Sequence, residues 1–92
     1  MDMKEDIRKN LLELIRSAKV GQGGDGNVAL TDNDMISKAA GLDSLAMGIL
    51  MEDVEKKYSI DTYRYFREGG SEKFGALIDY CADQISRKTD GK

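Results

Sequence analysis

The chain contains no histidine, no proline and no tryptophan, and it has a single cysteine. Without histidine it cannot form a Ser-His or Cys-His catalytic pair, and it lacks the commonest zinc ligand. One cysteine forms neither an internal disulfide nor a cysteine-rich metal site, and a lone thiol suits a reducing cytoplasm. These absences predict a protein that is not itself an enzyme and that has no metal site.

Long apolar runs are missing as well. No stretch approaches the ~20 apolar residues that a membrane span requires, and residues 1–6 are too charged for a signal peptide. A length of 92 residues fits one domain. We therefore expect a single cytoplasmic domain over residues 1–92, without a membrane span.

The charge is distributed unevenly along the chain. Residues 20–63 carry three basic and eight acidic side chains, a net charge of −5, whereas the segments before and after are each +1. Nucleic-acid binding depends on basic side chains that neutralise phosphates, so the acidic middle argues against a nucleic-acid partner. It favours a protein partner with a basic surface.

Apolar residues recur at the spacing of a helix face in three segments, and no segment alternates as a strand does. The first helix is predicted over residues 3–19, and a short one over residues 63–68. A second longer helix is predicted after the caps Asp43 and Ser44, with an apolar stripe of Met47, Leu50, Met51, Val54 and Tyr58. The last helix is predicted after the cap Ser71, with a stripe of Phe74, Leu77, Ile78, Cys81 and Ile85. The pattern predicts an all-α domain with three longer helices and a short third one.

Residues 21–27 hold four glycines, which predicts a flexible loop, and residues 88–92 are expected to form a C-terminal tail. The loop spells the dinucleotide fingerprint G-x-G-x-x-G, but it follows a helix rather than a strand, so we interpret it as a linker. Asp32, Asp34 and Asp43 have part of a calcium-loop spacing, yet the sixth position is Ser37 instead of glycine, and a solvated acidic loop is the preferred interpretation. Cys81 is expected to be a buried structural thiol.

The most informative segment is Gly41-Leu42-Asp43-Ser44-Leu45, which stands at the start of the second predicted helix. By itself, an Asp-Ser pair there is only a helix cap. The motif, its place after a long loop, and the helix order together resemble the acyl carrier protein family, which includes the peptidyl carriers. The hallmark of that family is G-x-D-S-L at the start of helix two. The resemblance implies a four-helix bundle with a short third helix.

The resemblance also implies a function. A phosphopantetheinyl transferase would attach 4′-phosphopantetheine covalently to Ser44, and Asp43 would help that enzyme hold its magnesium. The arm would carry acyl, polyketide or aminoacyl groups as thioesters to acyl-loading and acyl-processing enzymes, in fatty acid synthesis or in a polyketide, peptide or other specialised pathway. The carrier is expected to be a monomer. The alternative is a small helical interaction module without a prosthetic group.

The second helix departs from the acidic face that fatty-acid carriers display. Its exposed positions are expected to begin with Ala46 and Ile49, and the acids Glu52, Asp53 and Glu55 come later. We therefore expect partner recognition by Leu45, Ile49, Glu52 and Asp53, although a core position for Leu45 fits the sequence equally well. Gly48 lies inside the helix, either for close packing or to leave room for an acyl chain.

Overall fold

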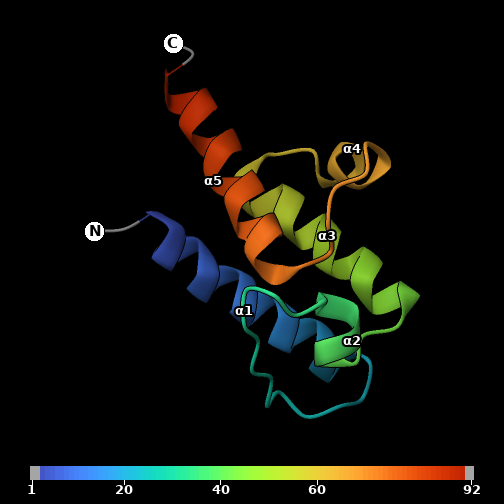
Figure 1. Ribbon diagram of the computed structural model, residues 1–92. Helices are drawn as coiled ribbons and strands as arrows, with labels where there is room; N and C mark the ends of the chain where they lie inside the picture. Colours follow the sequence, from blue (N-terminus) through green and yellow to red (C-terminus); the bar gives the residue numbers. More distant parts are fainter. Residues whose placement is uncertain (1–2, 91–92) are drawn as a thin grey trace.

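The protein is described by a computed structural model over residues 3–90, with side chains described for residues 3–87 (Figure 1). Over these residues it forms five helices and no strand: α1 (Met3–Gly21), α2 (Ile36–Ala40), α3 (Ser44–Tyr58), α4 (Thr62–Arg67) and α5 (Phe74–Asp90). The predicted all-α class is confirmed. Helix α2 was not predicted, because its five residues are too few to show a periodic stripe.

Helix α1 buries the face that the apolar spacing indicated, with Ile7, Leu11 and Ile15 each at most 2% exposed. It extends to Gly21, two residues beyond the prediction and into the segment expected to be a loop. Backbone N–H groups of Gln22, Gly23 and Gly24 donate to carbonyls of the last turn and close the helix. The glycine-rich connection therefore begins at Gln22, and we refer to residues 22–27 as the glycine loop.

Helix α3 begins at Ser44, and its N-cap is Asp43, whose side chain accepts a hydrogen bond from the Ala46 N–H. Ser44 is thus the first helical residue and not a cap, which corrects one prediction. The short helix α4 lies one residue earlier than expected and is capped by Asp61. Helix α5 runs to Asp90, so residues 88–90 are helical rather than part of a tail, while residues 91–92 lie outside the described range.

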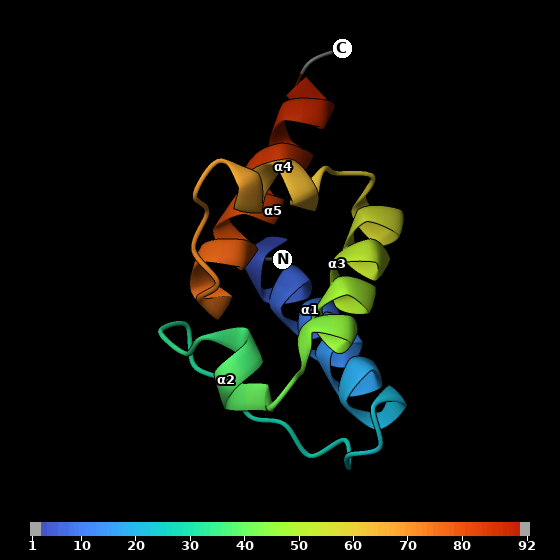
Figure 2. The same ribbon diagram turned by 90° about the vertical axis from the view of Figure 1, so that its right-hand side faces the viewer.

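The core lies where α1 packs against α3 and α5, while α4 packs against α3. In Figure 2, α1 passes between α3 and α5, and α4 crosses at one end of the assembly. The stripe predicted for α5 lies in this core, with Phe74, Leu77, Ile78 and Cys81 at most 1% exposed. None of the described helices is both long and apolar enough to cross a membrane.

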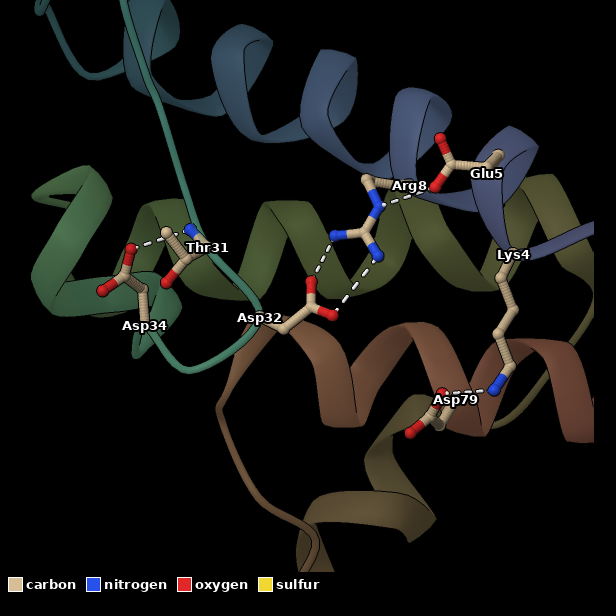
Figure 3. Close-up of polar contacts among 7 residues, drawn as sticks. All are labelled: Lys4, Glu5, Arg8, Thr31, Asp32, Asp34 and Asp79. Atoms are coloured by element: carbon tan, nitrogen blue, oxygen red, sulfur yellow. Dashed lines mark hydrogen bonds and ion pairs between the residues drawn. The ribbon is translucent and has the colours of Figure 1, made fainter.

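A second structural feature ties the turn at residues 31–34 to α1 and α5. The guanidinium of Arg8 in α1 forms a two-pronged ion pair with the Asp32 carboxylate and also bonds Glu5 (Figure 3). The backbone carbonyl of Asp32 accepts the Gly75 N–H at 2.9 Å, and that of Asp34 accepts the Phe74 N–H at 2.9 Å. We call this arrangement the Arg8–Asp32 joint.

Asp32 and Asp34, the two acidic residues of the turn at residues 31–34, both form contacts within the fold. Asp32 is exposed, and hydrogen bonding to Arg8 holds the pKa of its carboxyl below the ordinary 3.8. The Asp34 carboxylate accepts the Thr31 N–H at 2.8 Å. These two carboxylates therefore serve the turn itself, and among the described residues no group of three or more His, Cys, Asp or Glu side chains is placed to hold a metal ion.

Candidate functional site

Ser44 is exposed and occupies the first position of a helix of 15 residues. The Asp43 carboxylate accepts the Ala46 N–H at 2.8 Å, and the Asp43 carbonyl accepts the Met47 N–H at 2.9 Å. The helix start is therefore well formed, and the hydroxyl of Ser44 stands at the positive end of the helix dipole. A negatively charged group attached to Ser44 would be stabilised at this position.

The turn that leads into α3 is held in place by its neighbours. Gly41 has a φ of 70°, in the left-handed region where a residue with a side chain would be strained. The Leu42 N–H donates to the Ser37 carbonyl of α2 at 2.9 Å, and the Leu42 side chain is only 7% exposed. We refer to residues 41–43 as the Ser44 turn.

An open groove begins at Ser44 and has a volume of about 620 Å³. Its apolar wall is formed by the turn before α3, by α3 itself and by one residue of α4, and its polar rim includes Ser37 of α2 and Glu72. A second hollow of about 300 Å³ shares three of the wall residues, Gly48, Met51 and Phe66, and continues along α4. We call the first hollow the Ser44 groove; its apolar wall is formed by Leu42, Met47, Gly48, Met51 and Phe66.

Gly48 borders both hollows, and a Cβ atom built on it would meet no atom within 4 Å. Close packing therefore does not explain the glycine. The absence of a side chain leaves open space at the Ser44 groove.

Helix α4, which supplies Phe66 to the groove, is anchored by Glu55 of α3. Its carboxylate oxygen Oε2 accepts the Thr62 hydroxyl at 2.9 Å, the Thr62 N–H at 3.2 Å and the Tyr63 N–H at 3.3 Å. Thr62 is 1% exposed, so this carboxylate satisfies a buried polar side chain. Glu55 was expected to be one of the exposed acids of the helix, but it is half-buried and fixes one wall of the groove.

The residues expected to contact partners do not all lie on one exposed face. Leu45 is 75% exposed and Ile49 is 47% exposed, so the core position considered for Leu45 is wrong. Glu52 is exposed and Asp53 is half-buried. Ala46, expected to be exposed, is 3% exposed and packs in the core.

Leu45 and Ile49 lie between two hollows. On one side they border a pocket of about 340 Å³ that α3 shares with the end of α1 and that also touches Asp53. On the other side they border a shallow hollow with Ser44, Gly48 and Glu52. Three of the four predicted contact residues, Leu45, Ile49 and Glu52, therefore share a hollow with Ser44, whereas Asp53 lines the pocket on the other side.

Cys81 is fully buried, and desolvation raises the pKa of its thiol from 9.0 to about 12. A thiol of this kind is held in its protonated, unreactive form at neutral pH. The predicted buried structural role of Cys81 is confirmed.

Two residues of the site were not identified from the sequence. Glu55 acts across seven residues on the start of α4, and Gln22 bonds both Gly41 and Asp43 of the Ser44 turn. For Gln22 a signal existed, because it is the only long side chain among the glycines at 21, 23, 24 and 26. For Glu55 there was none beyond its position on the helix.

Comparison with known proteins finds no matching family model, no matching curated protein and no matching solved structure. The functional inference therefore rests on the residues and the geometry around Ser44.

Proposed function

We propose that the chain is an acyl carrier protein that carries 4′-phosphopantetheine on Ser44. One observation carries the proposal: the exposed Ser44 is the first residue of a long helix and lies at the edge of an apolar groove. The G-x-D-S-L sequence at residues 41–45 supports it independently. When attached, the arm supplies a thiol that holds acyl, polyketide or aminoacyl groups as thioesters for the enzymes of a specialised lipid or secondary-metabolite pathway.

The modification is a phosphoryl-type transfer in which Ser44 is the acceptor. The Ser44 Oγ forms a bond to the phosphorus that bears the pantetheine of coenzyme A, while the bond from that phosphorus to the nucleotide half breaks. Adenosine 3′,5′-bisphosphate leaves, and the serine proton passes to a base of the phosphopantetheinyl transferase. In this proposal Asp43 is the neighbour that helps the transferase hold magnesium.

The residues around Ser44 fit such a group. The negative phosphodiester would meet the positive end of the α3 dipole, an interaction worth roughly 0.3–1 kcal/mol at an exposed helix start. The apolar wall of the Ser44 groove begins at the attachment point and offers contact surface to the arm. The second hollow, which shares Gly48, Met51 and Phe66 with the groove, extends this surface between α3 and α4.

The helix order supports the same proposal. The longer helices α1, α3 and α5, with the short α4 before the last, have the order expected of a four-helix carrier bundle. Helix α2 is then an additional turn that leads into the Ser44 motif. Its C-cap is Gly41, the first residue of that motif.

The decisive experiment is an intact-mass measurement after incubation with coenzyme A, magnesium and a broad-specificity phosphopantetheinyl transferase. We expect the chain to gain one phosphopantetheine, and the Ser44→Ala variant to gain none. The loaded protein should also acquire a reactive thiol, which is that of the attached arm. In the folded chain Cys81 should not react, because it is buried and protonated. A chain that gains no mass would instead support an interaction module without a prosthetic group.

Partner recognition is proposed to involve Leu45 and Ile49, with the acids Glu52 and Asp53 beside them. The Ile49→Asp substitution places a charge at an apolar position that is 47% exposed, so the fold should tolerate it. We expect turnover by an acyl-processing partner to fall, while the mass gain at Ser44 is retained. Unchanged partner turnover would show that Ile49 is not a contact.

The Ser44 groove also allows a test of whether it shelters the cargo. The Gly48→Leu substitution would fill the open space beside Ser44, because nothing lies within 4 Å of the Cβ position. A sheltered acyl thioester should hydrolyse faster in this variant than in the wild type. Equal lifetimes would show that the cargo stays in solvent.

A further inference from the structure

The glycine loop contains one residue whose side chain reaches the Ser44 turn at two points. The amide Nε2 of Gln22 donates a hydrogen bond to the Gly41 carbonyl, and its Oε1 accepts the Asp43 N–H at 3.0 Å. The two bonded backbone groups belong to the first and last residues of the turn. A single neutral side chain thus forms hydrogen bonds to both ends of the turn immediately before Ser44. We call these two hydrogen bonds the clasp.

The end of α1 strengthens this contact. The Lys19 ammonium lies 3.4 Å from the same Gly41 carbonyl that Gln22 binds. The Lys19 stem runs so close to Gly24 that a Cβ atom there would lie 2.5 Å from the Lys19 Cε. A side chain at position 24 would therefore require the flexible Lys19 side chain to shift away from its present place beside the turn.

The clasp acts on the part of the backbone that sets the direction of Ser44. Gly41 is in the left-handed conformation, and Asp43 is the N-cap, so the turn changes chain direction just before the helix. The Asp43 N–H precedes the helix and takes no part in its hydrogen-bond ladder. Without Gln22 this N–H would be left to solvent, and the turn would lose its two hydrogen bonds to the glycine loop.

We propose that Gln22 is a positioning residue for the modification of Ser44. This inference rests on the proposed function and adds the glycine loop to it: the loop holds the serine turn in the form that a transferase binds. Gln22 touches neither the serine hydroxyl nor the coenzyme in this assignment. It acts only through the backbone of Gly41 and Asp43.

Removing the clasp should raise the cost of ordering the turn when the transferase binds. Fixing one residue of backbone carries a free-energy cost that corresponds to roughly a tenfold change in an equilibrium. For Gln22→Ala we therefore expect the transferase KM for the carrier to rise about five- to tenfold, with kcat changed less than about twofold. A general loss of folding would also raise the apparent KM, because less of the carrier would be folded substrate, but it would lower the thermal midpoint as well, so the midpoint is measured for each variant.

Amide hydrogen exchange tests the clasp without any transferase. In the unmodified full-length chain, the Asp43 amide should exchange at least about tenfold faster in Gln22→Ala than in the wild type. Gln22→Glu keeps an acceptor oxygen for the Asp43 N–H, so it should retain more of the protection. Asn27→Ala is the matched control, because Asn27 is an exposed amide of the same loop whose backbone N–H bonds Asp25 rather than the turn.

The outcomes separate the positioning role from the carrier function. If the wild type gains no phosphopantetheine, the proposed function fails, and with it the role of Gln22 in modification; the exchange result then reports only the structural clasp. If the wild type is modified but Gln22→Ala has an unchanged KM, or the same KM change as Asn27→Ala, the positioning role is overturned. An Asp43 amide that exchanges equally fast in wild type and Gln22→Ala would also overturn it.

Discussion

The turn at residues 31–34 is bonded by Arg8 of α1, and the Ser44 turn by Gln22 of the glycine loop with Lys19 of α1 beside it, and the contacts of Arg8 and Gln22 differ in chemistry. Arg8 holds the first turn through an ion pair with Asp32, whereas Gln22 holds the second through two uncharged hydrogen bonds. The first turn is also bonded to the start of α5 by its backbone. The second leads into a helix whose first residue is exposed.

The two regions also differ in the free space beside their glycines. At the Arg8–Asp32 joint, a Cβ atom on Gly75 would lie 2.7 Å from the Asp32 Cβ and 3.1 Å from the Asp32 carbonyl oxygen. Beside Ser44, a Cβ atom on Gly48 would meet nothing within 4 Å. The joint is thus a packed part of the fold, whereas the serine region is open at the surface around the exposed Gly48.

The largest effect is expected where the support is packed. Gly75→Ala forces either Asp32 or the start of α5 to move, because the contact involves a Cβ and a backbone oxygen rather than a flexible side-chain end. We expect the free energy of unfolding to fall by about 1–3 kcal/mol, the usual cost of overpacking. Urea denaturation followed by circular dichroism measures this value. A variant as stable as the wild type would show that the joint yields without cost.

The same substitution in the open region should have the opposite sign. Gly48 lies inside α3, where glycine is less favourable than alanine by roughly 0.5–1 kcal/mol, and the new methyl group meets no neighbour. We expect Gly48→Ala to raise the free energy of unfolding by about that amount, in the same denaturation experiment. A loss of stability would mean that the region beside Ser44 is packed after all, and the contrast with Gly75 would disappear.

The longer helices could be predicted from the sequence because the spacing of apolar residues within a helix is a local pattern. The spacing of Ile7, Leu11 and Ile15 was enough for α1, and that of Phe74, Leu77 and Cys81 was enough for α5. The error at Ala46 was avoidable, since residues 46, 50 and 54 follow one another at steps of four and share the buried face of α3. The five residues of α2, in contrast, contain too little periodicity to be recognised.

The candidate site was predicted only in part, for a related physical reason. Asp43 and Ser44 lie within a contiguous motif, so their place at a helix start could be inferred from the sequence. The contact from Gln22 to Asp43 spans 21 residues, and that from Arg8 to Asp32 spans 24. Such contacts depend on how the whole segment between α1 and α2 is placed against the rest of the chain, which no local pattern encodes. The attachment of phosphopantetheine to Ser44 stays a prediction.

The smallest effect on stability is expected from the charge at the joint, because Asp32 is exposed and water screens its ion pair with Arg8. Hydrogen bonding to Arg8 lowers the pKa of Asp32 in the folded state below its ordinary 3.8. The ionised carboxylate therefore stabilises the fold above the unfolded pKa, and this contribution is lost as the pH falls through the folded pKa. Asp32→Asn should thus be slightly less stable than the wild type at about pH 7, and the difference should shrink progressively as the pH falls below 3.8.

Salt provides the second arm of this measurement, since exposed ion pairs weaken as ionic strength rises. The difference between wild type and Asp32→Asn at neutral pH should shrink in about 1 M sodium chloride, where the screening length is only a few ångströms. Asp25→Asn removes the same charge from the glycine loop, where the carboxylate accepts the Asn27 N–H, and serves as the control. The effect of Gln22→Ala on Asp43 exchange should persist in the same salt, because that tie carries no charge. If salt abolished both effects, the two turns would not differ in the way that their side chains indicate.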